Sequence, residues 1–163
     1  MKMPKSTDHN LPFLANPSGE EIAAPPPHFD NPFLDFLVVE QCGIGEGWAR
    51  TAIEQRDQLN NMHGAVHGGV LMALLDTTMA RAAMAKQHYR FSVVSTGVTV
   101  NFLSPAKGKL YAEASAVGGG LSTCFCEAKI WDASGMLIAQ GMGTFKYKKP
   151  PGEGGQSLVQ SVE

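Results

Sequence analysis

The chain has 163 residues, of which 44% are hydrophobic, and a formal net charge of −2. This length suits one domain with a substantial core, and the nearly balanced charge argues against nucleic-acid binding. No apolar run approaches the roughly 18 residues that a membrane span needs, so no membrane association is expected. The first residues lack the apolar core of a secretory signal, and we expect a cytoplasmic protein.

The three cysteines do not indicate a disulfide or a metal site. Cys124 and Cys126 are two residues apart in a strand-like run, so their side chains should point to the same face of one strand. That is poor disulfide geometry, and no histidines stand at the spacing of zinc ligands. We interpret the cysteines as small buried side chains in a reducing compartment, and expect no metal and no cofactor.

The first part of the chain predicts an arm, a helical turn and a hairpin. Residues 1–27, rich in Pro, Asn, Ser and Glu, predict a disordered arm before a domain at 28–148. Residues 31–37, with Pro32 near the start, predict a short helical turn. Two strand-like runs, 36–42 and 47–55, flank a glycine-containing turn at 43–46, and a polar loop then leads to Asn61.

The second part predicts one long helix followed by strands. Residues 70–85 are mostly Ala, Leu and Met, apolar nearly all the way round, so this helix should be buried on most sides. Strands are expected at 89–103, 110–117, 121–131 and 136–147, and a disordered tail at 149–163. One buried helix and one antiparallel sheet have one compact arrangement: a curved sheet wrapped around the helix, in the α+β class.

Asp76 stands out because it is an acidic residue in the middle of this apolar helix. No basic residue lies three or four positions away, and Arg81, five positions on, points elsewhere around the helix. An unpaired carboxylate in apolar surroundings costs several kcal/mol, roughly, unless something uses it. A catalytic or ligand-contacting role is therefore the main hypothesis; a contact with a polar rim or with loop backbone is the alternative.

The start of the helix is the second candidate. Gly68 and Gly69 occupy the positions where a capping Ser, Thr or Asp is usual, so the first N–H groups should lack side-chain partners. Without a Cβ, another molecule can approach this backbone closely and receive hydrogen bonds on an oxygen atom. A plain glycine turn into a helix is the alternative.

A distance argument connects the two candidates. Gly68 and Asp76 are eight residues apart, or roughly 12 Å along a helix. A donor and a base that serve one carbon atom must both lie within about 3–5 Å of it. If both are catalytic, two copies of the helix must lie antiparallel, so that Gly68 of one meets Asp76 of the other, as two-fold symmetry allows.

These residues resemble the hotdog-fold acyl-CoA thioesterases, in the branch of phenylacetate degradation. The resemblance covers about residues 30–147 and rests on Asn61, the His67-Gly68-Gly69 motif, Asp76 and the run 101–106. It implies a homodimer paired through the strand near 93–103, often a dimer of such dimers. It also implies an acyl- or aryl-CoA thioester substrate bound at the subunit interface.

The resemblance also implies roles for individual residues. The Gly68 N–H resembles the donor to the thioester carbonyl, with His67 as an orienting residue beside it. Asn61 resembles a side-chain donor to the carbonyl or to water. Asp76 of the other subunit resembles the general base, or a nucleophile. Ser95 falls where some relatives hold the water with a hydroxyl group, although a shift of one residue would present its neighbour Thr96 instead.

Other residues are assigned less specifically. Basic residues near strand ends could contact the coenzyme phosphates; they are Arg90, Lys107, Lys109 and Lys146. Four methionines suggest an adaptable acyl-binding lining, with core packing as the alternative; they are Met62, Met72, Met79 and Met84. Two other functions remain open: a hotdog hydratase or dehydratase, which would use a histidine and a carboxylate, and a non-catalytic acyl-CoA binding protein.

Overall fold

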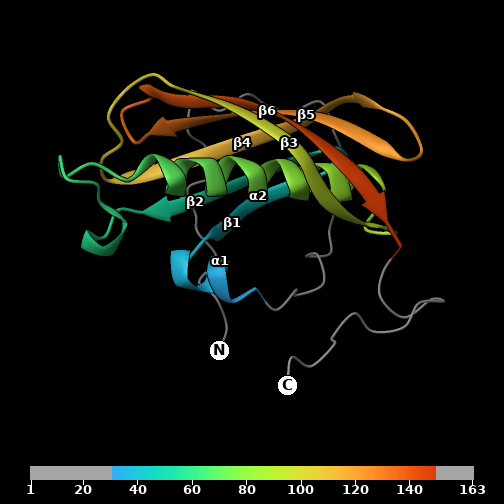
Figure 1. Cartoon of the computed structure of the whole chain (residues 1–163), viewed down its shortest axis with the longest axis horizontal. Helices are drawn as coiled ribbons and strands as arrows, with labels where there is room; N and C mark the ends of the chain where they lie inside the picture. Colours follow the sequence, from blue (N-terminus) through green and yellow to red (C-terminus); the bar gives the residue numbers. More distant parts are fainter. Residues whose placement is uncertain (1–30, 150–163) are drawn as a thin grey trace.

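The computed structural model describes residues 31–149, which form one sheet around one long helix (Figure 1). The predicted arm at 1–27 and nearly all of the predicted tail lie outside this range. The elements, in chain order, are α1 (Pro32–Leu37), β1 (Glu40–Gly45), β2 (Trp48–Glu54), the 3-10 helix η1 (Asp57–Leu59), α2 (Gly68–Lys86), β3 (Ser92–Phe102), β4 (Lys109–Gly119), β5 (Thr123–Asp132) and β6 (Leu137–Lys148).

The sheet has six antiparallel strands in the order β1-β2-β4-β5-β6-β3, and α2 contacts every one of them. Figure 1 shows α2 running along the inner face of the curved sheet, with α1 beyond β1. The predicted architecture, a curved sheet wrapped around a central helix, is therefore confirmed. Within residues 31–149, no helix is long and apolar enough to span a membrane.

The predicted start of the first strand was wrong. Asn31 Oδ1 accepts a hydrogen bond from the Leu34 N–H at 3.2 Å, and Pro32 occupies the first helical position. Both features stabilise the N-terminus of α1. The helix continues to Leu37 and ends at Val38, which has a left-handed φ of 55°. β1 therefore begins only at Glu40, and not at residue 36.

The hairpin turn also lies later than predicted. β1 continues through Gly45, which pairs with Trp48, so the turn is made by Glu46 and Gly47. Gly47 has a φ of +75°, a conformation that glycine adopts without strain. The sequence offers glycines at 43, 45 and 47, and only the paired register shows which one makes the turn.

The burial of α2 differs from the prediction in one respect. The side facing the sheet is fully buried and includes Leu71, Leu74, Leu75, Thr78, Met79, Ala82, Ala83 and Ala85. The opposite side is only partly covered: Met72 is 44% exposed, and Asp76 is half-buried. In a single chain, then, an apolar face of the helix with a carboxylate on it remains accessible.

A buried pair of hydroxyl groups joins α2 to the sheet. The Thr78 hydroxyl donates to the Leu74 carbonyl oxygen at 2.6 Å, and the oxygen atoms of Thr51 and Thr78 are 2.6 Å apart. Because Thr78 already uses its proton, Thr51 must donate to Thr78. Both residues are almost completely buried, so neither hydroxyl can turn to water instead.

The two threonines should differ in their contribution to stability. Thr78→Val removes the acceptor for Thr51 and leaves a buried hydroxyl unpaired, so we expect a loss of about 1–3 kcal/mol in the free energy of unfolding. Thr51→Val leaves the Thr78–Leu74 bond intact and should cost about 1 kcal/mol or less. Urea unfolding of both variants measures the difference; equal losses would contradict the assigned donor order.

The three cysteines are free and buried, as predicted. Cys124 and Cys126 point to the same inner side of β5, with their sulfur atoms 3.7 Å apart. The hydrogen bond between them lowers the pKa of the Cys124 thiol and raises the pKa of the Cys126 thiol. The two thiols thus act as one packed, hydrogen-bonded pair in the core.

β3 forms an unprotected edge of the sheet described here. Its sequence, SVVSTGVTVNF, contains no charged residue and no proline over eleven residues. Natural edge strands usually carry such residues, because an unguarded edge pairs with other chains. β1, at the opposite edge, is shorter and begins with Glu40. The β3 edge is therefore the side of the sheet best suited to pairing with a second copy.

Candidate active site

The loop before α2 is held in place by hydrogen bonds to the Asn61 side chain and between backbone groups. Asn61 Oδ1 accepts hydrogen bonds from the N–H groups of His63 at 2.9 Å and Ala65 at 3.2 Å. The Asn61 N–H donates to the Ala65 carbonyl at 2.7 Å, and the His67 N–H donates to the Leu59 carbonyl at 2.8 Å. The oxygen of the Asn61 side chain thus shapes the loop, which leaves its NH₂ group as the donor that can serve a ligand.

The expectation that no side chain caps α2 was wrong. His67 is the N-cap residue, and its Nδ1 accepts a hydrogen bond from the Gly69 N–H at 2.9 Å. Neutral imidazole accepts at one ring nitrogen and donates at the other, so the proton of neutral His67 belongs on Nε2. His67 therefore fixes the start of the helix and occupies one of its two glycine N–H groups.

Gly68, the other glycine, keeps its N–H available: among residues 31–149 it has no hydrogen-bond partner. A Cβ atom on Gly68 would lie 3.3 Å from Cζ and 3.4 Å from Cε1 of the Phe102 ring. A larger residue at position 68 would thus push against this ring. The helix dipole adds partial positive charge at this end, so an electron-rich oxygen is favoured at the Gly68 N–H.

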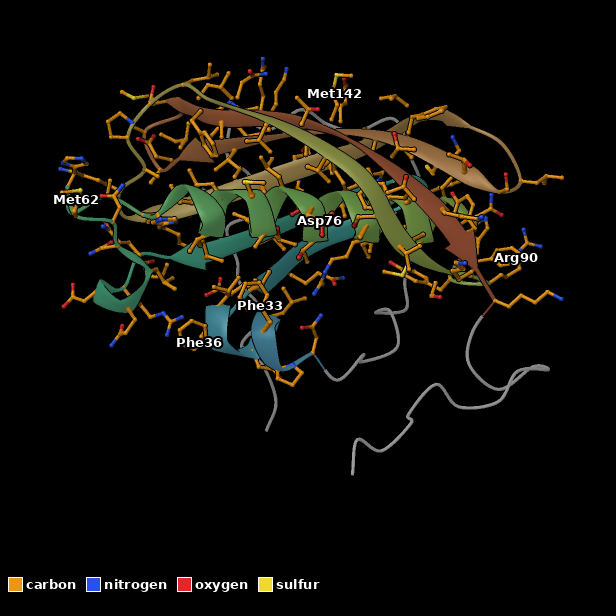
Figure 2. The ribbon with its side chains drawn as sticks, in the orientation of Figure 1. Phe33, Phe36, Met62, Asp76, Arg90 and Met142 are labelled. Atoms are coloured by element: carbon orange, nitrogen blue, oxygen red, sulfur yellow. The ribbon has the colours of Figure 1, made fainter. Side chains whose placement is uncertain are left out.

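Asp76 lies near the middle of α2, where β3 crosses the helix (Figure 2). The Ser95 hydroxyl donates a hydrogen bond to Asp76 Oδ1 at 2.6 Å. The Thr96 hydroxyl instead donates to the Thr144 carbonyl at 3.0 Å, on the strand ladder. The β3–β6 register shifts between Ser95 and Gly97, so Thr96 is the extra residue of a β-bulge. Of the two candidates, Ser95 is the one that reaches Asp76.

Substitutions at these two hydroxyls should separate their roles. Ser95→Ala removes the hydrogen bond that holds the Asp76 carboxylate, so we expect kcat to fall roughly tenfold, the equivalent of about 1.4 kcal/mol. Thr96→Val leaves that bond intact and should change kcat by less than about twofold. Steady-state kinetics of both variants on one of the thioesters that the resemblance implies measures this; a larger effect at Thr96 would reverse the assignment.

Arg81 does not neutralise Asp76. It donates a hydrogen bond to the side-chain oxygen of Gln41 on β1, and within residues 31–149 Asp76 forms no ion pair. Burial lowers the pKa of Arg81, and burial raises the pKa of the neighbouring Tyr89 to about 12. Arg81 is thus engaged with β1 and does not form an ion pair with the Asp76 carboxylate.

The structure brings some of the predicted residues together and separates others. Asn61, His67 and Gly68 lie at the start of α2, and Ser95 joins Asp76 about two turns further along. Of the basic residues, Lys109 pairs with Glu40 at 3.3 Å, and Arg90 bonds to Gln87. Of the methionines, Met79 is fully buried in the core, whereas Met62 is 92% exposed. Within one chain, the free N–H of Gly68 and the Asp76 carboxylate are thus two separate groups on the same helix.

One residue beside the site had no predicted role. Phe102, the last residue of β3, is 52% exposed, and its ring lies 3.3 Å from the position that a Cβ on Gly68 would occupy. The sequence shows an aromatic residue at the end of a strand, before Ser104 and Pro105, and that pattern has no functional meaning alone. Its position beside Gly68 depends on where β3 ends relative to α2, which the sequence does not show.

Comparisons with known proteins identify the family of the chain. The family model of the thioesterase superfamily matches residues 63–139. A candidate esterase from Halobacterium salinarum is 31% identical, over 72% of this chain and 85% of its own length.

Solved structures share the architecture. The PaaI protein from the phenylacetic acid degradation operon of Escherichia coli superposes with a TM-score of 0.68, at 24% identity, over 73% of this chain and 86% of its own. A thioesterase from Haemophilus influenzae gives 0.68 at 23% identity, over 74% and 85%. Helix, sheet order and sequence likeness thus agree, and the chain belongs to the thioesterase superfamily, with its hotdog fold.

Proposed function

We propose that the protein hydrolyses acyl- or aryl-CoA thioesters to the free acid and CoA. The observation that carries this proposal is the pairing of Asp76 with Ser95 on an accessible apolar face of α2. A carboxylate held by one hydroxyl group, without an ion pair among the described residues, is suited to accept a proton from water. The unpaired N–H of Gly68 supplies the complementary donor.

The proposed enzyme is a homodimer, because Gly68 and Asp76 of one chain are too far apart to act on one carbon atom. If α2 of one subunit lies antiparallel to α2 of the other, Gly68 faces Asp76 of its partner, and Met72 lies midway between them in the sequence. The unguarded β3 edge supports pairing on this side of the sheet. Two equivalent sites per dimer follow from the symmetry.

In the proposed reaction, the thioester carbonyl oxygen accepts a hydrogen bond from the Gly68 N–H. Asp76 of the other subunit takes a proton from water as the water oxygen attacks the carbonyl carbon. The helix dipole and the Gly68 N–H stabilise the negative charge on the resulting tetrahedral intermediate. The carbon–sulfur bond then breaks, and the CoA thiolate takes the proton from Asp76. Direct attack by the Asp76 carboxylate on the carbonyl is the variant of this scheme.

His67 and Asn61 are proposed to assist at the start of α2. His67 holds the helix start through Nδ1, which leaves its Nε2–H as a donor, and Asn61 offers its NH₂ group to the carbonyl or to the water. A hydratase would need a histidine free to move protons beside the carboxylate. The capping bond of His67 to Gly69 makes that role less suitable here, so hydrolysis is preferred.

Thiol release tests the proposal directly. Purified protein is mixed with acetyl-, hexanoyl- or phenylacetyl-CoA, and free CoA is followed with a thiol reagent. We expect release that depends on enzyme concentration with at least one of the three. Tight binding without release would instead indicate a binding protein, and loss of the enoyl absorbance of a 2-enoyl-CoA would indicate a hydratase. Light scattering on the same preparation measures whether the protein is a dimer or a dimer of dimers.

A further inference from the structure

Phe102 has an unusual position for a large apolar side chain. Its register partner on β6 is Ala139, and it shares the inner face of β3 with Val98 and Val100, which pack against the core. Phe102 itself is 52% exposed, so most of its ring contributes little to the core. An inward-facing aromatic residue that stays half exposed at the end of a strand is available for another contact.

The outer edge of the ring lies against the start of α2. Three ring atoms, Cζ, Cε1 and Cε2, lie 3.3, 3.4 and 3.8 Å from the position that a Cβ on Gly68 would occupy. The Gly68 nitrogen is bonded to the Cα atom that would carry this Cβ. A carbonyl oxygen that accepts a hydrogen bond from this N–H at about 2.9 Å lies on the same residue that the ring faces, so its substituents have the ring as a neighbouring apolar surface.

The surroundings of this contact are apolar as well. Met72 lies one turn after Gly68, on the same side of α2, and is 44% exposed. Its thioether side chain is flexible and adapts to different shapes. Phe102 and Met72 are thus two exposed apolar side chains that flank the start of α2, one from the end of β3 and one from the helix itself.

The geometry points to Phe102 as a specificity-determining residue, which binds the acyl group of the thioester and favours bulky apolar acyl groups over acetyl. This inference rests on the proposed thioesterase function. An acyl group of six or more carbons can bury apolar area against the ring, whereas the single methyl group of acetyl buries little. The contact forms in the ground state and persists in the transition state, so it should act mainly through KM.

The experiment compares Phe102→Ala and Phe102→Leu with the wild type on acetyl-, hexanoyl- and phenylacetyl-CoA. We expect Phe102→Ala to lower kcat/KM about tenfold or more for the two larger substrates, mainly by raising KM, and less than threefold for acetyl-CoA. Phe102→Leu keeps much of the apolar bulk and should restore most of the loss. Leu103→Ala is the matched control, because Leu103 is a large apolar residue that is 50% exposed and lies one position further along the chain. This variant should leave the ratios of kcat/KM among the three substrates unchanged.

The outcomes distinguish this inference from the proposed function. If the wild type releases CoA and Phe102→Ala changes all three substrates equally, or none, Phe102 does not select the acyl group. Dissociation of Phe102→Ala into monomers with loss of all activity would also overturn the inference, since the ring would then serve the subunit contact. If the wild type hydrolyses no CoA thioester, the proposed function itself fails, and the inference fails with it.

Discussion

Asp76→Asn is expected to lower kcat about a thousandfold or more while leaving the fold intact. General-base catalysis contributes roughly 10²–10⁴ in rate, and asparagine cannot accept the proton from water. The Asn oxygen can still accept the hydrogen bond that Ser95 donates at 2.6 Å to Asp76 in the wild type. The melting temperature should therefore change little, and thiol release with steady-state kinetics measures the loss.

Asp35→Asn is the matched control for this variant. It makes the same chemical change to an exposed carboxylate on α1, away from the predicted site. We expect wild-type activity from it within about twofold. Activity in Asp76→Asn within a few fold of the wild type would remove Asp76 from the chemistry, and with it the proposed mechanism.

The second large effect is the recovery of activity when two inactive variants are mixed. Asp76→Asn lacks the base, and Gly68→Val carries a side chain that would block the approach to the Gly68 N–H and press on the Phe102 ring. If each site takes Gly68 from one subunit and Asp76 from the other, a heterodimer of the two variants contains one intact site. Random assortment makes half of the dimers heterodimers, so we expect about a quarter of wild-type activity.

The mixture must be refolded together or co-expressed so that the subunits exchange. Each variant refolded alone is the control and should stay inactive, with circular dichroism showing that both are folded. If both residues served a site within one chain, the heterodimer would contain no intact site and activity would not recover. That result would contradict the shared site, whatever oligomer light scattering shows.

Much of the fold could be predicted because it depends on local patterns. The run of Ala, Leu and Met identified α2, and β-branched or aromatic residues at most positions identified the long strand that follows. Element ends were less accurate: β1 begins at Glu40 because the Asn31 cap and Pro32 extend α1 to Leu37. The N-cap of α2 was missed, because helix N-caps are usually Ser, Thr, Asp or Asn, which accept with a side-chain oxygen. Here His67 accepts the Gly69 N–H with its ring nitrogen Nδ1 instead.

The sequence by itself determined the class of fold, the central helix and the two candidate groups, Gly68 and Asp76. The periodicity of a helix depends only on residues that are close together in the sequence, so it is visible without the tertiary structure. The tertiary structure decided that Ser95, and not Thr96, holds Asp76, because a bulge against β6 sets which hydroxyl faces the helix. It also placed the Phe102 ring over the start of α2, 3.3 Å from where a Cβ on Gly68 would lie. Strand register depends on residues far away along the chain, so these contacts exist only once the sheet has formed around α2.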